Sequence, residues 1–346
     1  MNLQFDDSPI KDSLYPFTAT RNAADIRIGI LTIREKWEHL AQKKGIDASN
    51  TVIQANIVPT LQYIESMGDV TDANVPAQHP SQDVRILENP WHIFQYNDWA
   101  IRKDYELLTA GKSSQPIPAG NTVVAPDNVF IEEGAIISCS IINASTGPVY
   151  IGKNAEIMEG CIIRGPLALC EGAVLKMGTK VYGATTLGPF CVGGGEIKNS
   201  VLFGYSNKAH DGYLGDSVLG EWCNLGAGTT NSNLKNTAGQ VKVWSKAAKN
   251  YVLAGTKCGL LMGDYSRSAI NTAFNTGTVV GVSCNIFGAA YPSKYVPDFT
   301  WGSQSYHFDK ALQDIANWKK LKGKTITTAE TNILQSLYNH INNSTQ

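Results

Sequence analysis

The sequence is short of charge, of paired cysteines and of long apolar runs, and each shortage excludes a class of protein. Charged residues make up only 17% of the 346 residues and the formal net charge is −1, so no nucleic-acid partner is expected. No apolar run approaches the ~20 residues that a membrane helix needs. The first residues, MNLQFDDSPIKDS, are acidic and polar, unlike a signal peptide. We therefore expect a cytoplasmic protein with no membrane partner.

The seven cysteines lie singly between Cys139 and Cys284, and no two of them form a CxxC pair. An odd, scattered set predicts neither a disulfide framework nor a zinc site. We expect these thiols to serve as small buried hydrophobic groups in a reducing compartment. No metal site is predicted.

An aliphatic residue recurs at every sixth position in the middle of the chain, and glycines fill much of the space between. A second and a looser third series follow after residue 213. An α-helix repeats every 3.6 residues and a strand every two, so a period of six fits neither. It is typical of short strands joined by tight turns, three to a coil, with aliphatic groups pointing inward. The first series comprises Ile151, Ile157, Ile163, Leu169, Leu175, Val181 and Leu187.

This period predicts a mainly β protein built on a left-handed parallel β-helix, with the repeat running from roughly Val123 to Pro292. We place the helix over residues 119–295, with a β-hairpin inserted near 236–256, where QVKVW and NYVLA flank SKAAK. A small α/β domain is predicted over residues 1–118. It has strand-like DIRIGILTI, helix-like REKWEHLAQKKG, then TVIQANIVPT, a polar stretch DVTDANVPAQHPSQD and a helix from WHIFQYNDWAIRKDY. A C-terminal tail over 296–346 contains two helices, from Phe308 to about Gly323 and from TTAETNILQSLYNHIN.

Polar side chains cluster in the segment GYSNKAHDGYLGDSVLGEWCNLGAGTTNSNLKN. It contains His210, which has the only imidazole of the repeat region and a type of side chain suited to general-base work near neutral pH. Tyr213 and Asn224 bring uncharged polar groups, and Lys198 precedes His210 by twelve residues. From the period alone, a histidine that caps a turn beside corner-filling asparagines is the favoured interpretation.

This segment resembles the acetyltransferase half of the bifunctional glucosamine-1-phosphate acetyltransferase/N-acetylglucosamine-1-phosphate uridyltransferases, whose pattern runs roughly KAGHLxYLGDxxIGxxxNIGAGTxxxN. The segment KCGLLMGDYSRSAIN, starting at Lys257, is similar to the archaeal sugar-phosphate nucleotidyltransferase/aminosugar acetyltransferases. The chain as a whole resembles a Bacteroidetes-type family of sugar nucleotidyltransferases, through TATRNAADIRIGILTIREKW. The resemblance implies an acyltransferase coil behind a shortened nucleotidyltransferase domain.

The resemblance assigns a role to each matching residue. It makes His210 the general base that takes a proton from an acceptor amine attacking an acyl-CoA thioester, with Asn233 beside the reacting groups. It also implies acetyl-CoA or another acyl-CoA as co-substrate, a sugar phosphate or nucleotide sugar as partner, and a homotrimer with sites in the clefts between subunits. The LGAGT turn would offer backbone N–H groups to an oxyanion. Substrate binding falls to Lys198, Tyr213 and Asn224, and cofactor binding to Ala227, Lys242 and Lys257.

The sequence departs from these families at three places. An arginine that grips the sugar phosphate is missing from LGPFCVGGGEIK, with Arg164 about two coils away as a weak substitute. Ile270 stands where the family has a serine that contacts the cofactor. The N-terminal segment LYPFTATRNAADI lacks the glycines and the lysine of a phosphate cradle. Arg21, Asp25 and Arg27 are read as remnants of that cradle.

Three functions follow from these observations. The first is acyl transfer to a sugar phosphate or nucleotide sugar. The second is a sugar-1-phosphate nucleotidyltransferase, uridylyl- or thymidylyltransferase-like, which alone would require Mg²⁺. The third is a non-enzymatic trimer that binds a sugar nucleotide. We expect the chemistry at the polar turn of His210 and the interruption after Lys235.

Overall fold

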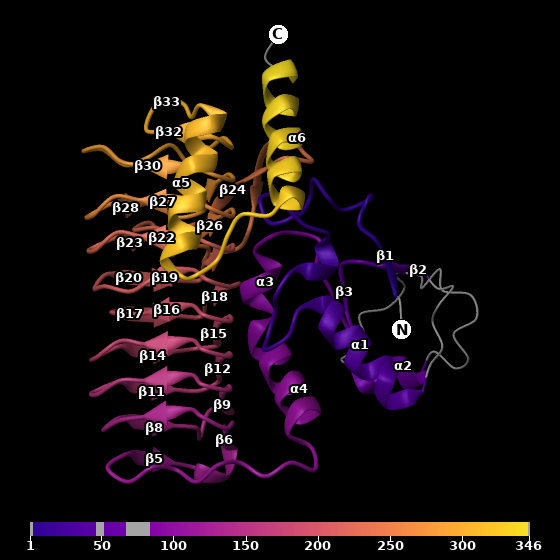
Figure 1. Ribbon diagram of the computed structural model, residues 1–346, viewed down its shortest axis with the longest axis vertical. Helices are drawn as coiled ribbons and strands as arrows, with labels where there is room; N and C mark the ends of the chain where they lie inside the picture. The colour runs from indigo at the N-terminus through magenta and orange to yellow at the C-terminus, as the bar shows by residue number, and fades with distance from the viewer. Residues whose placement is uncertain (1–2, 46–51, 67–83, 345–346) are drawn as a thin grey trace.

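The computed structural model describes residues 3–45, 52–66 and 84–344, and its largest part is a coil of stacked short strands (Figure 1). The coil has three faces, each a parallel sheet in which every strand pairs with the equivalent strand of the next coil. Because every backbone ladder runs between coils, each coil is held in place by the coils beside it. The predicted parallel β-solenoid is confirmed.

Each face has its own set of strands. The first face comprises β5 Thr122–Val124, β8 Ile141–Asn143, β11 Ile162–Arg164, β14 Lys180–Tyr182, β17 Glu196–Lys198 and β20 Tyr213–Gly215, followed by the pair β23 Thr230–Asn231 and β28 Ala273–Phe274. The second comprises β7 Ile136–Ile137, β10 Glu156–Ile157, β13 Val174–Leu175, β16 Val192–Gly193, β19 Asn207–Lys208, β22 Asn224–Leu225, β27 Arg267–Ser268, β30 Asn285–Ile286, β32 Thr300–Trp301 and an antiparallel end strand, β33 Gln304–Ser305. The third comprises β6 Val129–Ile131, β9 Val149–Ile151, β12 Leu167–Leu169, β15 Thr185–Leu187, β18 Val201–Leu202, β21 Val218–Leu219, β26 Leu260–Met262, β29 Thr278–Val280 and β31 Tyr295–Val296.

The aliphatic series lines the inside of the coil, as predicted. All seven of its members are buried, none more than 1% exposed. Parallel register stacks like positions on one another, for example Ile157 on Leu175 and Leu169 on Leu187. Burying an aliphatic side chain of this size contributes about 1.5–3 kcal/mol, so the stacked interior is the main stabilising element of the coil.

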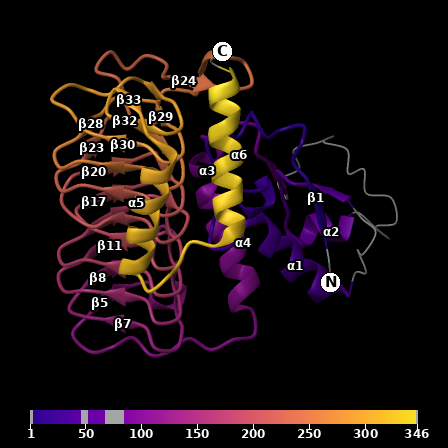
Figure 2. The same ribbon diagram turned by 45° about the horizontal axis from the view of Figure 1, so that its top comes forward.

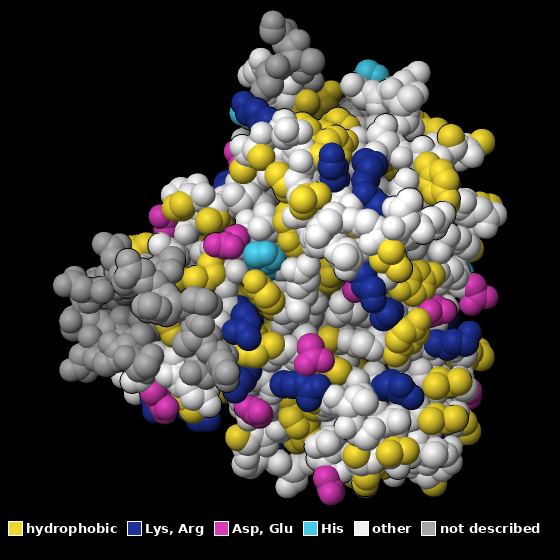
Figure 3. Space-filling model, turned by 180° about the vertical axis from the view of Figure 1, so that it is seen from behind, with side chains coloured by type: hydrophobic (Ala, Val, Ile, Leu, Met, Phe, Trp, Pro, Cys, Tyr) yellow, Lys and Arg dark blue, Asp and Glu magenta, His cyan; other side chains and the backbone are white. Residues whose placement is uncertain are grey.

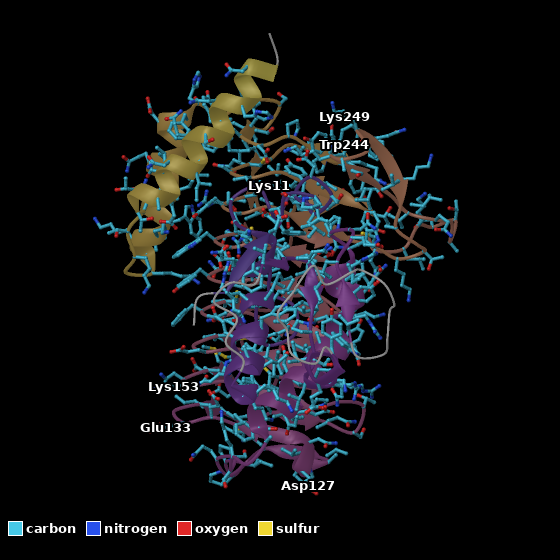
Figure 4. All side chains as sticks on the ribbon, turned by 90° about the vertical axis from the view of Figure 1, so that its right-hand side faces the viewer. Lys11, Asp127, Glu133, Lys153, Trp244 and Lys249 are labelled. Carbon is cyan, nitrogen blue, oxygen red and sulfur yellow. The ribbon has the colours of Figure 1, made fainter. Side chains whose placement is uncertain are left out.

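The coil continues beyond Pro292, where the repeat was predicted to stop. Both β31 and β32 pair in parallel with the coil before them. The predicted hairpin is present as β24 Lys242–Ser245 and β25 Asn250–Leu253, which pair antiparallel. Figure 4 shows Trp244 and Lys249 on this hairpin, where it projects from the upper part of the coil.

The N-terminal part consists of helices and two-stranded pairs rather than a full sheet. The prediction of a strand at DIRIGILTI is wrong, because the chain forms a short 3-10 turn, Ala23–Asp25, and then reverses at Gly29, whose φ is +74°. The predicted polar stretch from Asp69 to Asp83 lies outside the described residues. The elements are β1 Gln4–Asp6, α1 Ile33–Lys44, β2 Val52–Gln54, β3 Ile57–Val58, α2 Leu61–Ser66, β4 Arg85–Ile86, α3 His92–Gln95 and α4 Asn97–Thr109.

This N-terminal part packs on the outside of the third face and shares a core with it (Figure 2). The outward side chains of β18, β21, β26 and β29 join the cluster that buries Phe17 and Trp37. Thr186 donates a hydrogen bond to the Gly29 carbonyl at 2.9 Å, and Asn97 donates one to the Ala184 carbonyl at 2.9 Å. Helix α4 is therefore fixed to the coil by polar as well as apolar contacts.

A buried ion pair holds the reversal at Gly29. The Asp104 carboxylate accepts a hydrogen bond from the Lys36 ammonium and two more from the backbone N–H groups of Ile30 (2.7 Å) and Leu31 (3.1 Å). Both charged side chains are at most 4% exposed. Burial raises the pKa of Asp104 while Lys36 opposes that rise. The pair thus ties α1, α4 and the loop that precedes α1 together.

The C-terminal part begins with two helices, α5 Phe308–Leu321 and α6 Thr328–Ser344, which confirm the prediction for the tail. Helix α5 lies along the second face, and α6 packs beside α5 (Figures 1 and 2). Beneath α5, three aromatic rings from the corners between the third and second faces stack on one another. The Phe190 and Tyr205 rings are 5.1 Å apart, and the Tyr205 and Trp222 rings 4.3 Å. The Lys319 ammonium lies over the Trp222 ring, 4.8 Å from the ring centre.

The surface agrees with the low net charge of the sequence. Hydrophobic, basic and acidic side chains are intermixed over the rear of the molecule (Figure 3).

All seven cysteines are free thiols, and Cys139 differs from the expectation because it is exposed while the other six are buried. Among the described residues, no helix has both the length and the apolar composition to cross a bilayer, and no three potential metal ligands of the His, Cys, Asp or Glu type lie together.

Replacing Lys36 with Met is expected to lower the free energy of unfolding by ~3–5 kcal/mol, because it leaves the Asp104 carboxylate buried without its cation. Denaturant unfolding followed by circular dichroism measures the loss. Lys103→Met, on α4 in a more exposed pair with Glu106 at 3.8 Å, is the matched control and should cost less than ~1 kcal/mol. Equal losses in the two variants would contradict a special role for the buried pair.

Candidate active site

The predicted base, His210, lies at a corner of the coil between β19 on the second face and β20 on the first face. Its side chain is exposed to solvent. The same corner of the next coil carries Ala227, and Gly228 there donates a backbone hydrogen bond to the Asp211 carbonyl at 3.1 Å. The corner after that carries Ile270, whose neighbour Asn271 donates to the Ala227 carbonyl at 2.7 Å. His210, Ala227 and Ile270 therefore follow one another along a single edge of the coil.

Tyr213 begins β20, three residues after His210, and is held by a network of amides. Its hydroxyl accepts a hydrogen bond from the Asn233 amide at 3.0 Å. Asn233 also donates to the Asp216 carboxylate, which accepts a second bond from Asn199 at 2.7 Å. Burial, with the Asp216 charge as a further cause, raises the pKa of Tyr213 well above its usual value. Tyr213 is therefore a neutral phenol whose own hydrogen can be donated to a ligand.

Lys198 lies on the same face as Tyr213, because β17 and β20 are neighbouring strands and Lys198 pairs with Gly215. Its ammonium is 5.6 Å from the centre of the Tyr182 ring. The Tyr182 hydroxyl donates to the Glu196 carboxylate, and this bond, together with burial, raises the pKa of Tyr182 to about 12. The structure thus brings Lys198, Tyr213 and Asn233 together on the first face, one corner away from His210.

Asn224 lies elsewhere, on β22 of the second face, so within one chain it does not join the Tyr213 network. Its side-chain oxygen accepts a long hydrogen bond, 3.4 Å, from Asn207. Asn207 in turn accepts a hydrogen bond from Lys322, just after α5, at 3.0 Å. Arg267, the register partner of Asn224, lies under the Trp318 ring of α5 at 5.1 Å. Helix α5 therefore covers this part of the second face.

The two predicted cofactor lysines lie at the hairpin. Lys242 is exposed at the first position of β24, and its carbonyl accepts a hydrogen bond from Lys294 at 2.8 Å. Lys257 is exposed where the chain returns to the coil and forms an isolated antiparallel bridge with Leu234. That bridge puts the Lys257 backbone next to Asn233, whose carbonyl accepts a bond from the Cys258 N–H at 2.9 Å.

Most N–H groups of the LGAGT turn serve the coil itself. Gly226 donates to Ser268, Gly228 to Asp211 and Thr229 to Gly226, each within 3.1 Å. The weak substitute for the missing arginine, Arg164, is on β11 of the first face, three strands from β20. At ~4.8 Å per strand that is roughly 14 Å away, too far for direct contact with a ligand at Tyr213.

Sequence reasoning missed two members of this network, Asp216 and Asn199. Asp216 is 4% exposed and has a φ of +47°, in the left-handed region. The signal was present in YLGD, where the aspartate follows Tyr213 by three residues, and in EIKNS, where Asn199 follows Lys198. Their partnership depends on two corners of neighbouring coils coming into register, which the local sequence does not specify.

Two residues interpreted from the sequence as remnants of a nucleotide cradle, Arg21 and Asp25, form structural contacts. Arg21 is 12% exposed and pairs with Asp264 and, at 3.3 Å, with Glu221. Thr20 donates to the same Asp264 carboxylate at 2.5 Å. Asp25 pairs with Arg34 at 2.6 Å. These groups attach the N-terminal segment to the coil and to α1.

Several known proteins are similar to this chain. A family model described as sugar nucleotidyl transferase matches residues 3–75. A bifunctional sugar-1-phosphate nucleotidylyltransferase/acetyltransferase of Sulfurisphaera tokodaii is 30% identical over 307 residues, which cover 80% of this chain and 67% of the relative. Two proteins named bifunctional protein GlmU match over shorter stretches. That of Methanocaldococcus jannaschii is 30% identical over 195 residues (56% of this chain, 41% of the relative). That of Synechococcus elongatus is 24% identical over 221 residues (57% and 44%).

The chain spans less than half the length of these two GlmU relatives. A solved polySia-specific acetyltransferase aligns over 59% of the chain at 10% identity, with a TM-score of 0.27, and that likeness is too weak to add to the fold seen here. The match to the Sulfurisphaera tokodaii protein is long and covers two thirds of it. The chain therefore belongs to the family of bifunctional sugar-1-phosphate nucleotidylyltransferase/acetyltransferases.

Proposed function

We propose that the protein is an acyl-CoA-dependent acyltransferase that modifies an amine of a sugar phosphate or nucleotide sugar. The observation that carries the proposal is the arrangement around β20. An exposed imidazole lies at one corner, and a neutral phenol, a lysine and an amide network occupy the adjoining face. A base beside groups that bind hydroxyls and anions is the minimum equipment for this reaction.

In the proposed reaction His210 takes a proton from the acceptor amine as its nitrogen attacks the thioester carbonyl. A C–N bond forms, the C–S bond of the tetrahedral intermediate breaks, and the CoA sulfur leaves with the proton from His210. Tyr213 and Asn233 hold the acceptor, and Lys198 meets its anionic group. Asn224 would not contact the same ligand from the same chain, since it lies on another face under α5.

The acyl-CoA is proposed to lie along the coil edge that carries His210 and Ala227. The N–H groups of Gly226, Gly228 and Thr229 already donate hydrogen bonds within the coil. Ala227 is therefore the residue of this turn best suited to donate to the thioester oxygen. Ile270, at the next corner, is 69% exposed and offers an apolar contact for the pantetheine arm. Lys242 and Lys257, exposed at the hairpin, are suited to the phosphates of the cofactor.

We further propose a cytoplasmic homotrimer. Six buried free thiols suit a reducing compartment. Outward aliphatic side chains on the lower first face, Val124, Ile141 and Ile162, are each 46–51% exposed, and contact between subunits would bury them.

Nucleotidyl transfer is the second candidate, and the family match over residues 3–75 favours it. The structure supports it less well, because Arg21 is paired with both Asp264 and Glu221, and Asp25 is paired with Arg34. These paired groups do not fit a magnesium triphosphate cradle. Pyrophosphate release from a nucleoside triphosphate and a hexose-1-phosphate would restore this candidate. A non-enzymatic sugar-nucleotide-binding trimer would be favoured instead if calorimetry detected no acyl-CoA binding.

His210→Gln is expected to slow acyl transfer by ~10²–10⁴-fold, because the amide cannot take the proton from the attacking amine. Release of free CoA thiol with an aminosugar phosphate as acceptor measures the rate. His39→Gln, at an exposed position of α1 far along the chain from the site, is the matched control. A His210→Gln enzyme as fast as the control would rule out the proposed base.

Tyr213→Phe is expected to raise the KM for the acceptor by roughly 5–10-fold, because it removes one hydrogen bond of about 1 kcal/mol. The kcat should change little, since the phenol binds the acceptor and does not take part in the proton transfer. Steady-state kinetics with the acceptor varied gives both constants. Tyr291→Phe, at a position that is 67% exposed, serves as control, and an unchanged KM in Tyr213→Phe would remove Tyr213 from the acceptor site.

A further inference from the structure

One inward position of the coil holds a lysine. The inward residues of the second face are otherwise aliphatic or small, but β16 and β19 place Gly193 and Lys208 on successive coils, paired in register. Lys208 is only 2% exposed, so its four-carbon stem runs through the aliphatic interior. The neighbours of Gly193 close around it, because a Cβ built there would lie 2.7–3.0 Å from the side chains of Leu187, Ile197 and Leu175. The interior at this level is therefore tightly filled.

The Lys208 ammonium ends at two backbone carbonyls of the same edge. It donates to the Gly194 carbonyl at 2.9 Å and to the carbonyl of His210. Burial lowers the pKa of Lys208 to about 8, with the Asp211 charge opposing the change, so the amine carries its charge at neutral pH. An ammonium can donate three hydrogen bonds, and charge-assisted bonds of this kind are stronger than neutral ones.

These two bonds stand where other coils use the backbone. At this edge a corner N–H usually donates to the corner carbonyl of the coil below. Between the corners of Gly194 and His210 no corner N–H forms such a bond among the described residues. The Glu196 N–H at the start of β17 donates to the Gly212 carbonyl at 3.1 Å, and Lys208 supplies the further link at Gly194 and His210. The bonds at other levels are Gly160 to Cys139, Gly178 to Glu159, Gly228 to Asp211 and Asn271 to Ala227.

The glycines of GGGEIK let the two corners approach each other closely at this level. A Cβ on Gly194 would meet the Ala209 carbonyl, and one on Gly195 would lie 2.8 Å from the Asp211 Cα and 2.9 Å from the His210 carbonyl oxygen. Only glycine lets the corner that carries His210 approach the coil below so closely. The corner thus rests on a glycine step and is tied to it by the lysine from inside.

We propose that Lys208 is a positioning residue for acyl transfer, an internal clamp whose ammonium fixes the backbone corner that carries His210. The inference rests on the proposed function for its effect on rate, whereas the clamp itself is a statement about local structure. A base must be held within about 0.5 Å of its working position. The backbone bonds of this corner are made by Asp211 and Gly212, so the bond from Lys208 is the one that holds the carbonyl of His210 itself.

Lys208→Met tests the clamp, because the thioether keeps the volume of the stem and removes the ammonium. We expect hydrogen–deuterium exchange of the Glu196 and Gly228 amides, which donate to the Gly212 and Asp211 carbonyls of this corner, to quicken by about tenfold or more while the rest of the coil keeps its protection. The kcat of CoA release should fall by about 10–100-fold, with the KM for the acceptor within about twofold, because the base is misplaced but the acceptor site is intact. Lys153→Met, on an exposed corner of a lower coil, should alter neither measurement.

The outcomes separate the clamp from the proposed reaction. Unchanged exchange of the Glu196 and Gly228 amides in Lys208→Met would mean that the lysine only fills space, and would overturn the clamp whatever the rate. A loss of protection throughout the coil would also overturn it, because the role would then be general. If wild-type protein releases no CoA, the proposed function fails, and the local exchange result still decides the clamp. Should Lys208→Met not fold, Lys208→Gln, which is shorter and uncharged, is measured in the same way and judged by the same local exchange.

Discussion

The stacking of one coil on the next is the constraint on which the rest of the structure depends. Each strand is only two or three residues long in most of the coil, far too short to be stable alone. Its backbone partners all come from the coils above and below, and its inward side chain is covered by theirs and by the other two faces of its own coil. A residue at a corner is therefore placed by its neighbouring coils as much as by its own sequence. The column of His210, Ala227 and Ile270 exists because three successive corners stack.

The same dependence explains the N-terminal part. Its helices have little sheet of their own to pack on, and they use the outward side chains of the third face instead. The segment that resembles a nucleotide signature has been recruited to this junction, since Arg21 and Thr20 both bind Asp264 of the coil. A side chain that is buried in such a contact cannot bind a phosphate. This segment therefore resembles a nucleotide-binding sequence, whereas its side chains attach the N-terminal part to the coil.

The sequence predicted what depends on periodicity. The sixfold series gave the coil, its buried side and the hairpin that interrupts it, because one aliphatic residue per face is enough to define the repeat. The two C-terminal helices followed from 3.6-residue spacing. What it did not predict depends on register between coils or on a turn. DIRIGILTI looked like a strand because its aliphatic residues alternate, but Gly29 reverses the chain and the backbone bonds go to Asp104 instead.

The candidate site was predicted in the same uneven way. Lys198, Tyr213 and Asn233 lie near one another because they share a face. Asn224 was grouped with Lys198 and Tyr213 through the resemblance, although the chain passes along β21 of the third face before it reaches Asn224 on the second face. Lys208 stands two residues before His210 and was passed over. Its inward direction follows from register with Gly193, and a glycine in the aliphatic series conceals the register at that point.

The aromatic stack beneath α5 gives the protein an optical property. Phe190, Tyr205 and Trp222 each adopt a positive φ, between 55° and 59°, so their rings are held in parallel by the corners of successive coils. The Tyr205 and Trp222 planes differ by only 2°. Fixed, closely spaced chromophores of this kind couple their transitions, and Lys319 of α5 supplies a charge over the indole. The near-ultraviolet spectrum of the protein therefore reports whether α5 lies on the coil.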